Sequence, residues 1–235
     1  MFRLFSVLIL LFSAFGAQAQ PLFPNSVVSN DLDFIRPEDP NAFQCVSQTD
    51  QGRREMPDKR SDQLFVNDVR VFTARYQDGT AVEFWLHPRL RRDRVVEPVA
   101  RAIGHLPTQM RALLNHVVIH AGNETAFAED EGRFFVLYDQ NIQARLGTRD
   151  LQETVFHESV HATLDIPHKD SRVWRQAQRR DGAFVTQYAA RNPNQEDLAE
   201  TALFAWAMIQ HPGRLGPQIE AGVEARAAQR LAFLR

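Results

Sequence analysis

The segment between Thr148 and Leu164 limits the possible fold more than any other part of this sequence. Its pattern predicts a helix that has Thr148 as its N-cap and reaches about Leu164. Residues 151–164 contain no lysine or arginine, which an exposed helix would normally carry. At about 100° per residue, the polar side chains share one arc of roughly 100°, and these are Asp150, Thr154, His157, Glu158, His161 and Asp165. We therefore expect a buried helix with a single polar stripe, for which other segments must supply partners.

Two histidines of this stripe have the spacing of zinc ligands. His157-Glu158-Ser159-Val160-His161 is an H-E-x-x-H pattern, and side chains four residues apart lie on one side of a helix, about a turn apart. Both imidazoles can therefore reach one Zn²⁺ ion, while Glu158 faces the water molecule on the metal. The alternative is a pair of structural histidines with satisfied hydrogen bonds. The buried stripe of ligand-type residues favours a metal site.

A catalytic zinc ion usually has three protein ligands, so the chain must supply one more. Asp165 continues the stripe one turn beyond His161 and is one candidate, either as a ligand or as a carboxylate beside a ligand histidine. Glu196 and Glu200 are stronger candidates, because they lie four residues apart in a segment expected to be helical, 192–211. Acidic residues also favour the first turn of a helix for electrostatic reasons alone, which explains Glu196 better than Glu200.

These motifs resemble those of the gluzincin metallopeptidases, and they are especially similar to the peptidase domain of the anthrax lethal factor family. In that family an E-x-x-A-E helix follows the H-E-x-x-H helix and a tyrosine precedes it. Here Glu196-Asp197-Leu198-Ala199-Glu200 matches that helix, and Tyr188 lies eight residues before Glu196. The resemblance covers about residues 106–210 and implies a zincin-like fold. It implies that Glu196 is the third ligand, that Glu200 contacts a ligand histidine and that Tyr188 stabilises the oxyanion.

The remaining pattern predicts an α+β fold, with a small N-terminal sheet followed by helices. Alternating apolar residues on both sides of Asp78-Gly79 predict a β-hairpin over residues 69–86. Short apolar runs predict strands at 116–120 and 134–138. The strand 134–138 precedes the H-E-x-x-H helix, and we expect it to be the edge strand that binds the substrate main chain. Helical spacing predicts the remaining helices, at residues 95–103, 108–114, 172–180, 192–211 and 219–234.

The first nineteen residues predict export from the cytoplasm. An apolar run follows Arg3, and Ala17-Gln18-Ala19 fits the rule for signal-peptidase cleavage, so residues 1–19 are expected to be removed. The run is too short for a comfortable membrane span, and we expect a periplasmic or secreted protein without stable membrane insertion. Residues 20–63, rich in Pro, Asn, Asp, Gln and Arg, are expected to form an irregular N-terminal extension. Residues 64–235 then form a single zincin-like catalytic domain.

Composition excludes several other classes of protein. Hydrophobic residues make up 44% and charged residues 24% of the chain, which is average for a soluble globular protein. A formal net charge of −2 gives no general reason to bind nucleic acid. The single cysteine, Cys45, cannot form an internal disulfide, so stability must come from a full-size core, a metal ion, or both.

Together these features predict an exported zinc metallopeptidase that acts on peptide or protein substrates. Zinc lowers the pKa of its bound water and polarises a carbonyl group, and Glu158 is expected to take the proton of that water and deliver it to the leaving amine. Two alternatives remain open. One is a zincin-like module that binds zinc without catalysis, and the other is a zinc amidase with a non-peptide substrate. The sequence predicts neither the substrate preference nor the oligomeric state.

Overall fold

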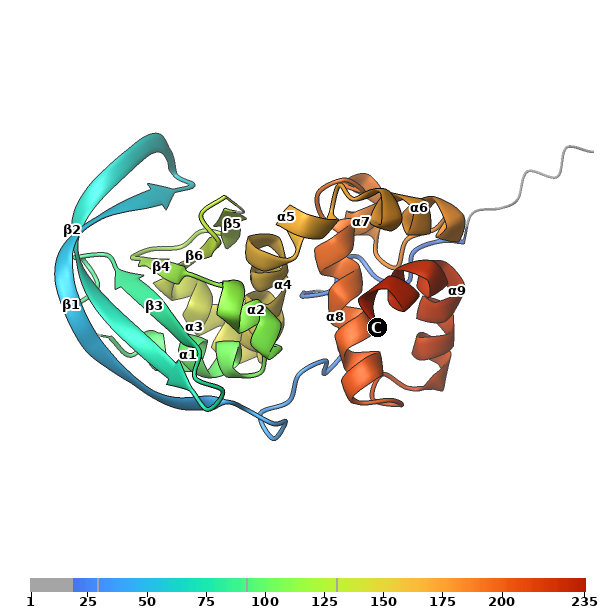
Figure 1. Ribbon diagram of the computed structural model, residues 1–235, viewed down its shortest axis with the longest axis horizontal. Helices are drawn as coiled ribbons and strands as arrows, with labels where there is room; N and C mark the ends of the chain where they lie inside the picture. The colour runs from blue at the N-terminus through green and yellow to red at the C-terminus, as the bar shows by residue number, and fades with distance from the viewer. Residues whose placement is uncertain (1–18, 29, 92, 130) are drawn as a thin grey trace, which may run out of the picture.

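Six strands form one mixed sheet at one end of the molecule, and a helical region follows, so the predicted α+β class is confirmed (Figure 1). This computed structural model describes residues 19–28, 30–91, 93–129 and 131–235. Apart from Ala19, the predicted signal peptide lies outside the described residues. Among these residues, no helix is both long enough and apolar enough to cross a membrane.

The predicted hairpin lies in the middle of the sheet. β2 (Ser61–Tyr76) and β3 (Ala81–Leu86) pair antiparallel, and Gly79 in the turn between them has a φ of 84°, which glycine adopts without steric cost. Alternation along β3 places three buried apolar side chains on one face, Val82, Phe84 and Leu86. The two predicted strands follow in parallel, β4 (His116–His120) beside β3 and β6 (Phe134–Tyr138) beside β4.

The prediction that Phe134–Tyr138 is the edge strand is wrong. The strand order is β1-β2-β3-β4-β6-β5, so β6 lies between β4 and β5. β5 (Phe127–Glu129) pairs antiparallel with the first part of β6 and ends the sheet. A strand of three residues is too short to show an alternating pattern, and so the sequence does not reveal it.

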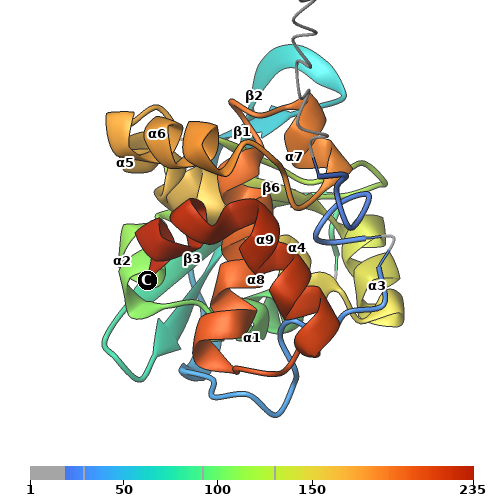
Figure 2. The same ribbon diagram turned by 90° about the vertical axis from the view of Figure 1, so that its right-hand side faces the viewer.

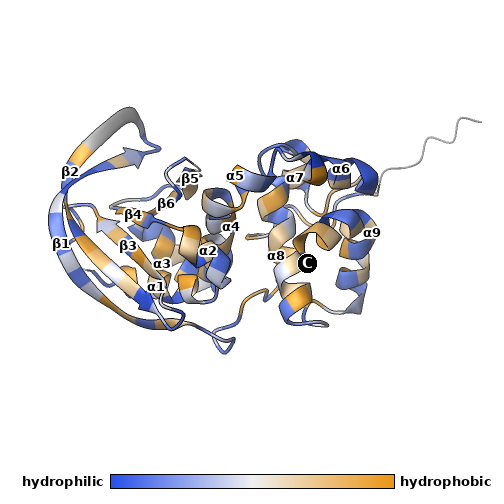
Figure 3. Ribbon diagram, viewed as in Figure 1, coloured by the Kyte–Doolittle hydropathy of each residue, from blue (hydrophilic) through white to orange (hydrophobic). Residues whose placement is uncertain are grey.

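The expectation of an irregular segment over residues 20–63 holds only for its first part. β1 (Phe43–Asp58) is a strand of 16 residues that pairs antiparallel with β2 along its length. Its side chains are mostly polar and exposed, with only Met56 fully buried, so no alternation marks it as a strand. Figure 3 shows this hydrophilic strand beside the more hydrophobic central strands. Backbone hydrogen bonds to β2, rather than side-chain burial, hold β1 in the sheet.

The helix with the polar stripe, α4 (Leu151–Thr163), lies between the sheet and the C-terminal helices (Figure 1). One apolar core is continuous from the sheet through α4 to α8 (Asp197–Gln210) and α9 (Pro217–Leu234). Figure 2 shows α9 and α8 crossing this end of the molecule. The remaining helices are α1 (Val96–Gly104), α2 (Thr108–Leu113), α3 (Asp139–Thr148), α5 (Asp165–His168), α6 (Arg172–Asp181) and α7 (Gln187–Arg191).

Thr148 does not cap α4, contrary to the prediction. It is the last residue of α3, and its hydroxyl donates backwards to the carbonyl oxygen of Ala144 (3.1 Å). Arg149 then adopts a left-handed conformation with a φ of 63°, and α4 begins after Asp150. The chain therefore turns sharply between two helices where the sequence suggests the start of only one.

A buried charge network joins the start of α8 to α6 and α9. Arg230 on α9 is fully buried, and its guanidinium donates to Asp181 (Nε to Oδ2, 2.9 Å) at the end of α6 and to Asp197 in the first turn of α8. Gln178 also donates from Nε2 to Oδ2 of Asp197 (2.9 Å). Because Asp197 directly follows Glu196, this network determines where a predicted metal ligand lies.

We expect Arg230→Ala to lower the free energy of unfolding by about 3 to 5 kcal/mol, because it leaves the buried carboxyl group of Asp197 without its guanidinium partner. Arg235→Ala is the matched control, since Arg235 forms an exposed ion pair with Glu224 (2.8 Å) and its loss should change stability little. Urea unfolding followed by circular dichroism measures both variants. Equal losses in the two variants would contradict the importance of the buried network.

Candidate metal centre

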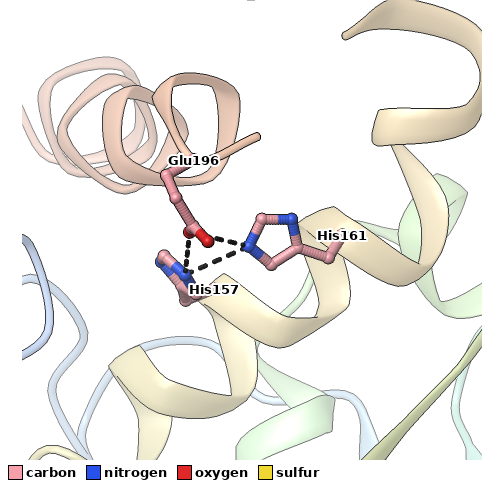
Figure 4. Close-up of side chains that lie close together, drawn as sticks. All are labelled: His157, His161 and Glu196. Atoms are coloured by element: carbon pink, nitrogen blue, oxygen red, sulfur yellow. Dashed lines mark hydrogen bonds and ion pairs between the residues drawn. The ribbon is translucent and has the colours of Figure 1, made fainter. Parts of the chain in front are cut away.

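α4 and the start of α8 bring three potential metal ligands together (Figure 4). His157 and His161 lie one turn apart on α4, and Glu196 immediately precedes α8. One ligand atom from each of the three lies within 4.8 Å of the others. The prediction that His157, His161 and Glu196 form one group that could hold a metal ion is therefore confirmed.

The spacing of these ligand atoms fits a tetrahedral ion. Nε2 of His157 and Nε2 of His161 are 3.2 Å apart. Oε2 of Glu196 lies 3.4 Å from Nε2 of His157 and 3.2 Å from Nε2 of His161. Ligand atoms that bind one zinc ion tetrahedrally at about 2.0 to 2.1 Å are separated by about 3.3 to 3.4 Å. All three separations are close to that value, and a single small cation fits between the three atoms.

Asp165 lies on the opposite side of the His161 ring from the other ligand atoms. Its Oδ2 atom is 2.7 Å from Nδ1 of His161, while Nε2 of the same ring faces Glu196. A carboxylate that accepts a hydrogen bond from Nδ1 fixes the tautomer in which Nε2 is free to bind a metal. Asp165 thus occupies the position of a carboxylate beside a ligand histidine rather than that of the third ligand.

Glu200 lies beside Nδ1 of His157 as Asp165 lies beside Nδ1 of His161, but the distance between the two atoms is longer. Its Oε1 atom lies 3.6 Å from Nδ1 of His157, and the side chain is almost completely buried. Ser26 donates two hydrogen bonds to this carboxylate, from its backbone nitrogen and from its hydroxyl group. The sequence does not reveal this contact, because Ser26 precedes Glu200 by 174 residues and no local pattern marks it.

Tyr188 also reaches the centre. Its hydroxyl group donates to Oε1 of Glu196 (3.0 Å), and its side chain is 40% exposed. α7, which carries Tyr188, starts after Thr186, whose hydroxyl accepts a hydrogen bond from the Ala189 amide as an N-cap. The tyrosine therefore lies beside Glu196, one of the three potential ligands.

A cavity of about 330 Å³ opens beside the three ligands. Glu158 and Tyr188 both line it, so the three ligands, the carboxylate and the tyrosine share one space. Residues 126–129, which include the whole of edge strand β5, form another part of the wall, and Lys59 at the tip of the β1–β2 hairpin contributes as well. The sequence gives no sign that Lys59 or β5 lies here.

The carboxylates around the two histidines make this centre attract positive charge. Although burial favours its neutral form, hydrogen bonds to His157 and His161 hold the pKa of Glu196 well below its ordinary value. Burial disfavours the charged form of His161, but hydrogen bonds to Asp165 and Glu196 raise its pKa to about 10. Burial raises the pKa of Glu158, against the opposing effect of the two histidines. Protons and a metal cation therefore compete for the same negatively charged surroundings.

Comparisons of the chain with protein-family models, with curated proteins and with solved structures find no match in any of the three. The likeness to the gluzincin metallopeptidases consequently depends on the motifs of the sequence, and the geometry of the site stands on its own.

The structure predicts different effects for the two carboxylates next to His161. Glu196→Gln should weaken zinc binding by at least about 100-fold, because it removes the negative charge of a ligand that faces both imidazoles. Asp165→Asn should weaken it only by about 10-fold, the order expected for a group that orients a ligand. Competition with a zinc-binding dye measures both. A larger loss in Asp165→Asn than in Glu196→Gln would show that the ligand is Asp165.

A pH dependence of stability is expected from Glu153, which lies one turn before His157 on α4. Burial raises the pKa of Glu153 from its ordinary 4.5 to about 7, although Oε1 accepts a hydrogen bond from the Ile35 amide (3.1 Å). The folded chain thus holds this proton more tightly than the unfolded chain, and the stabilisation is lost as the pH rises through 7.

Glu153→Gln cannot lose a proton, so its stability relative to the wild-type chain should increase by about 2 kcal/mol between pH 5 and pH 8. Glu38→Gln, at an exposed position, is the control and should show no such trend. Urea unfolding at the two pH values measures the difference. A constant difference between Glu153→Gln and the wild-type chain would refute the buried titration.

Proposed function

We propose that this protein is an exported zinc-dependent metallopeptidase that hydrolyses peptide bonds. The observation that carries the proposal is the near-tetrahedral spacing of Nε2 of His157, Nε2 of His161 and Oε2 of Glu196 in a cavity that Glu158 also lines. The motif likeness to the gluzincin metallopeptidases supports the same function.

The donor set favours zinc. Two imidazole nitrogens and one carboxylate oxygen are a common ligand set of catalytic zinc, and three protein ligands leave one position open. A structural zinc site normally has four protein ligands, and the group found among the described residues has three. When bound, zinc supplies a Lewis acid that polarises the substrate carbonyl and makes water a better nucleophile.

Glu158 is the general base in this proposal. α4 places it next to His157 in the chain, and its carboxylate lines the cavity in which substrate and water would meet. It takes a proton from the attacking water molecule and later delivers that proton to the nitrogen of the leaving amine. A zinc site with a structural role alone would not need a carboxylate at this position.

Tyr188 is placed to stabilise the oxyanion that forms when water attacks the carbonyl carbon. Its hydroxyl group can donate one hydrogen bond, and it donates this bond to Glu196 in the described structure. The side chain is partly exposed at the cavity, so a rotation can redirect the hydroxyl towards a bound substrate. The role proposed for Tyr188 includes this movement.

The substrate main chain is proposed to pair with β5 rather than with β6. β5 ends the sheet and lines the same cavity as Glu158, whereas β6 is an inner strand. An extended peptide can add to an exposed edge strand through backbone hydrogen bonds, which act on peptides of many sequences. Export, to a periplasm or out of the cell, is proposed from residues 1–19 alone.

The deciding experiment is Glu158→Gln. This variant should keep its zinc and lose at least about 99% of its activity on a peptide library, because the amide cannot accept the proton. Glu153→Gln is the matched control, with the same substitution five residues earlier on the same helix, and it should remain active. Metal analysis and cleavage assays measure both properties.

Two outcomes would overturn the proposal. A wild-type chain that takes up no zinc at neutral pH would remove the metal site. A chain that takes up zinc but cleaves no peptide would point to a non-catalytic zinc-binding module, or to an amidase with a non-peptide substrate.

A further inference from the structure

An extended segment near the N-terminus lies against the part of the chain that carries Tyr188. We call residues Leu22–Val28 the N-terminal strap. The backbone nitrogen of Leu22 donates to the carbonyl oxygen of Val185 (2.8 Å). Further along, the backbone nitrogen of Gln187 donates to the carbonyl oxygen of Phe23 (2.9 Å). The backbone nitrogen of Tyr188 donates to the carbonyl oxygen of Pro24 (3.0 Å). The strap thus adds to residues 185–188 like a short parallel strand, and a bridge joins Phe23 to Thr186.

Apolar packing holds the beginning of the strap in place. The Phe23 ring stacks on Phe204 of α8 with the ring centroids 5.7 Å apart. On α9, a Cβ atom at Gly222 would lie 3.0 Å from Cδ1 of Leu22, so glycine allows the strap to lie close to this helix. The strap therefore has a fixed position relative to α8 and α9.

Ser26 connects the strap to the metal centre. It is fully buried, and it makes contact with both oxygens of Glu200. The backbone nitrogen donates to Oε2 (2.8 Å), and the hydroxyl group donates to Oε1 (3.0 Å). Two donors on the two oxygens fix the rotation of a carboxylate as well as its position.

The carboxylate that Ser26 fixes faces a ligand. Oε1 of Glu200 is 3.6 Å from Nδ1 of His157, and within the described part of the chain this nitrogen has no hydrogen-bond partner. A small movement would bring the two atoms into hydrogen-bond distance, with Nδ1 as the donor. Nε2 of His157 would then be the free nitrogen, and it is the one that faces Glu196.

We propose that Ser26 is a positioning residue of the metal centre, which acts through Glu200 on His157. The proposal rests on the metal centre of the proposed function. The strap also contacts a second partner of the ligands, since Pro24 holds the backbone of Tyr188, whose hydroxyl donates to Glu196. One segment outside the H-E-x-x-H and E-x-x-A-E motifs thereby orients groups beside two of the three ligands.

The position of the strap is consistent with the predicted processing of the chain. Cleavage after Ala19 would leave Gln20 as the first residue, and the carbonyl oxygen of Gln20 accepts a hydrogen bond from Nε of Arg226 (2.6 Å). The strap would remain complete in the mature chain. Loss of a few more residues would remove Ser26, and with it the donors to Glu200.

Zinc affinity of the purified chain, measured by competition with a zinc-binding dye, tests the proposal without an activity assay. Ser26→Ala should weaken zinc binding by about 10-fold, the lower end of the range for groups that orient metal ligands. Ser171→Ala is the matched control, because it also removes a serine hydroxyl that makes a hydrogen bond, in this case one accepted from the backbone nitrogen of Trp174 at the start of α6 (3.1 Å). Its zinc affinity should stay within about twofold of wild type.

A double-mutant cycle shows whether Ser26 acts through Glu200. Glu200→Gln alone should weaken zinc binding by about 10-fold or more, and adding Ser26→Ala to it should change the affinity by less than about twofold. A merely structural role of Ser26 would give equal losses in both backgrounds. Equal losses, or an unchanged affinity in Ser26→Ala, would overturn the proposal while leaving the metallopeptidase function intact.

Thermal unfolding with and without zinc accompanies each measurement. If Ser26→Ala does not fold, Ser26→Thr decides, because it keeps the hydroxyl donor. A folded Ser26→Thr chain with affinity near that of wild type supports the proposal, and a folded chain with a 10-fold loss overturns it. A wild-type chain that binds no zinc would refute the metal centre itself, and this proposal with it.

Discussion

A buried helix with ionisable side chains is stable only if other segments provide partners for them, and the architecture of this protein follows from that requirement. α4 contributes the buried His157 and the partly buried His161, and neither can be left without hydrogen bonds or charge partners at low cost. Glu196 from the start of α8 faces both rings on one side. On their other sides, Asp165 and Glu200 face one Nδ1 atom each. The packing of α4 against α8 therefore brings together the side chains of the proposed metal centre.

The position of α8 depends in turn on a second buried network. Asp197, next to Glu196, is held by Arg230 of α9, which also binds Asp181 at the end of α6. Three helices are thus joined at the residue that follows Glu196, a potential ligand. The N-terminal strap adds a fourth element, through the contact between Ser26 and Glu200. Contacts of this kind around the ligands are what the proposed metal site, with its three ligands, requires.

The elements that the sequence reveals are those with strong periodic patterns. The hairpin around Gly79 has apolar residues at the spacing of a strand, and α1 has them at the spacing of a helix. The strands β4 and β6 are short continuous apolar runs. β1, β5 and α3 escape prediction for identifiable reasons. β1 buries few side chains, β5 has three residues, and α3 buries only Ile142, so none of them shows a clear apolar face.

For the site, the sequence alone determined which side chains share one face of a helix, because this depends only on local geometry. Helical periodicity places His157, Glu158 and His161 on one face of α4 whatever the rest of the chain does. Tertiary structure decided the distant contacts. It placed Glu196 rather than Asp165 on the side of the rings where the potential metal ligands meet, and it brought Ser26 to Glu200 across 174 residues. Such contacts depend on how complete helices and strands pack against one another, and no spacing along the chain encodes that packing.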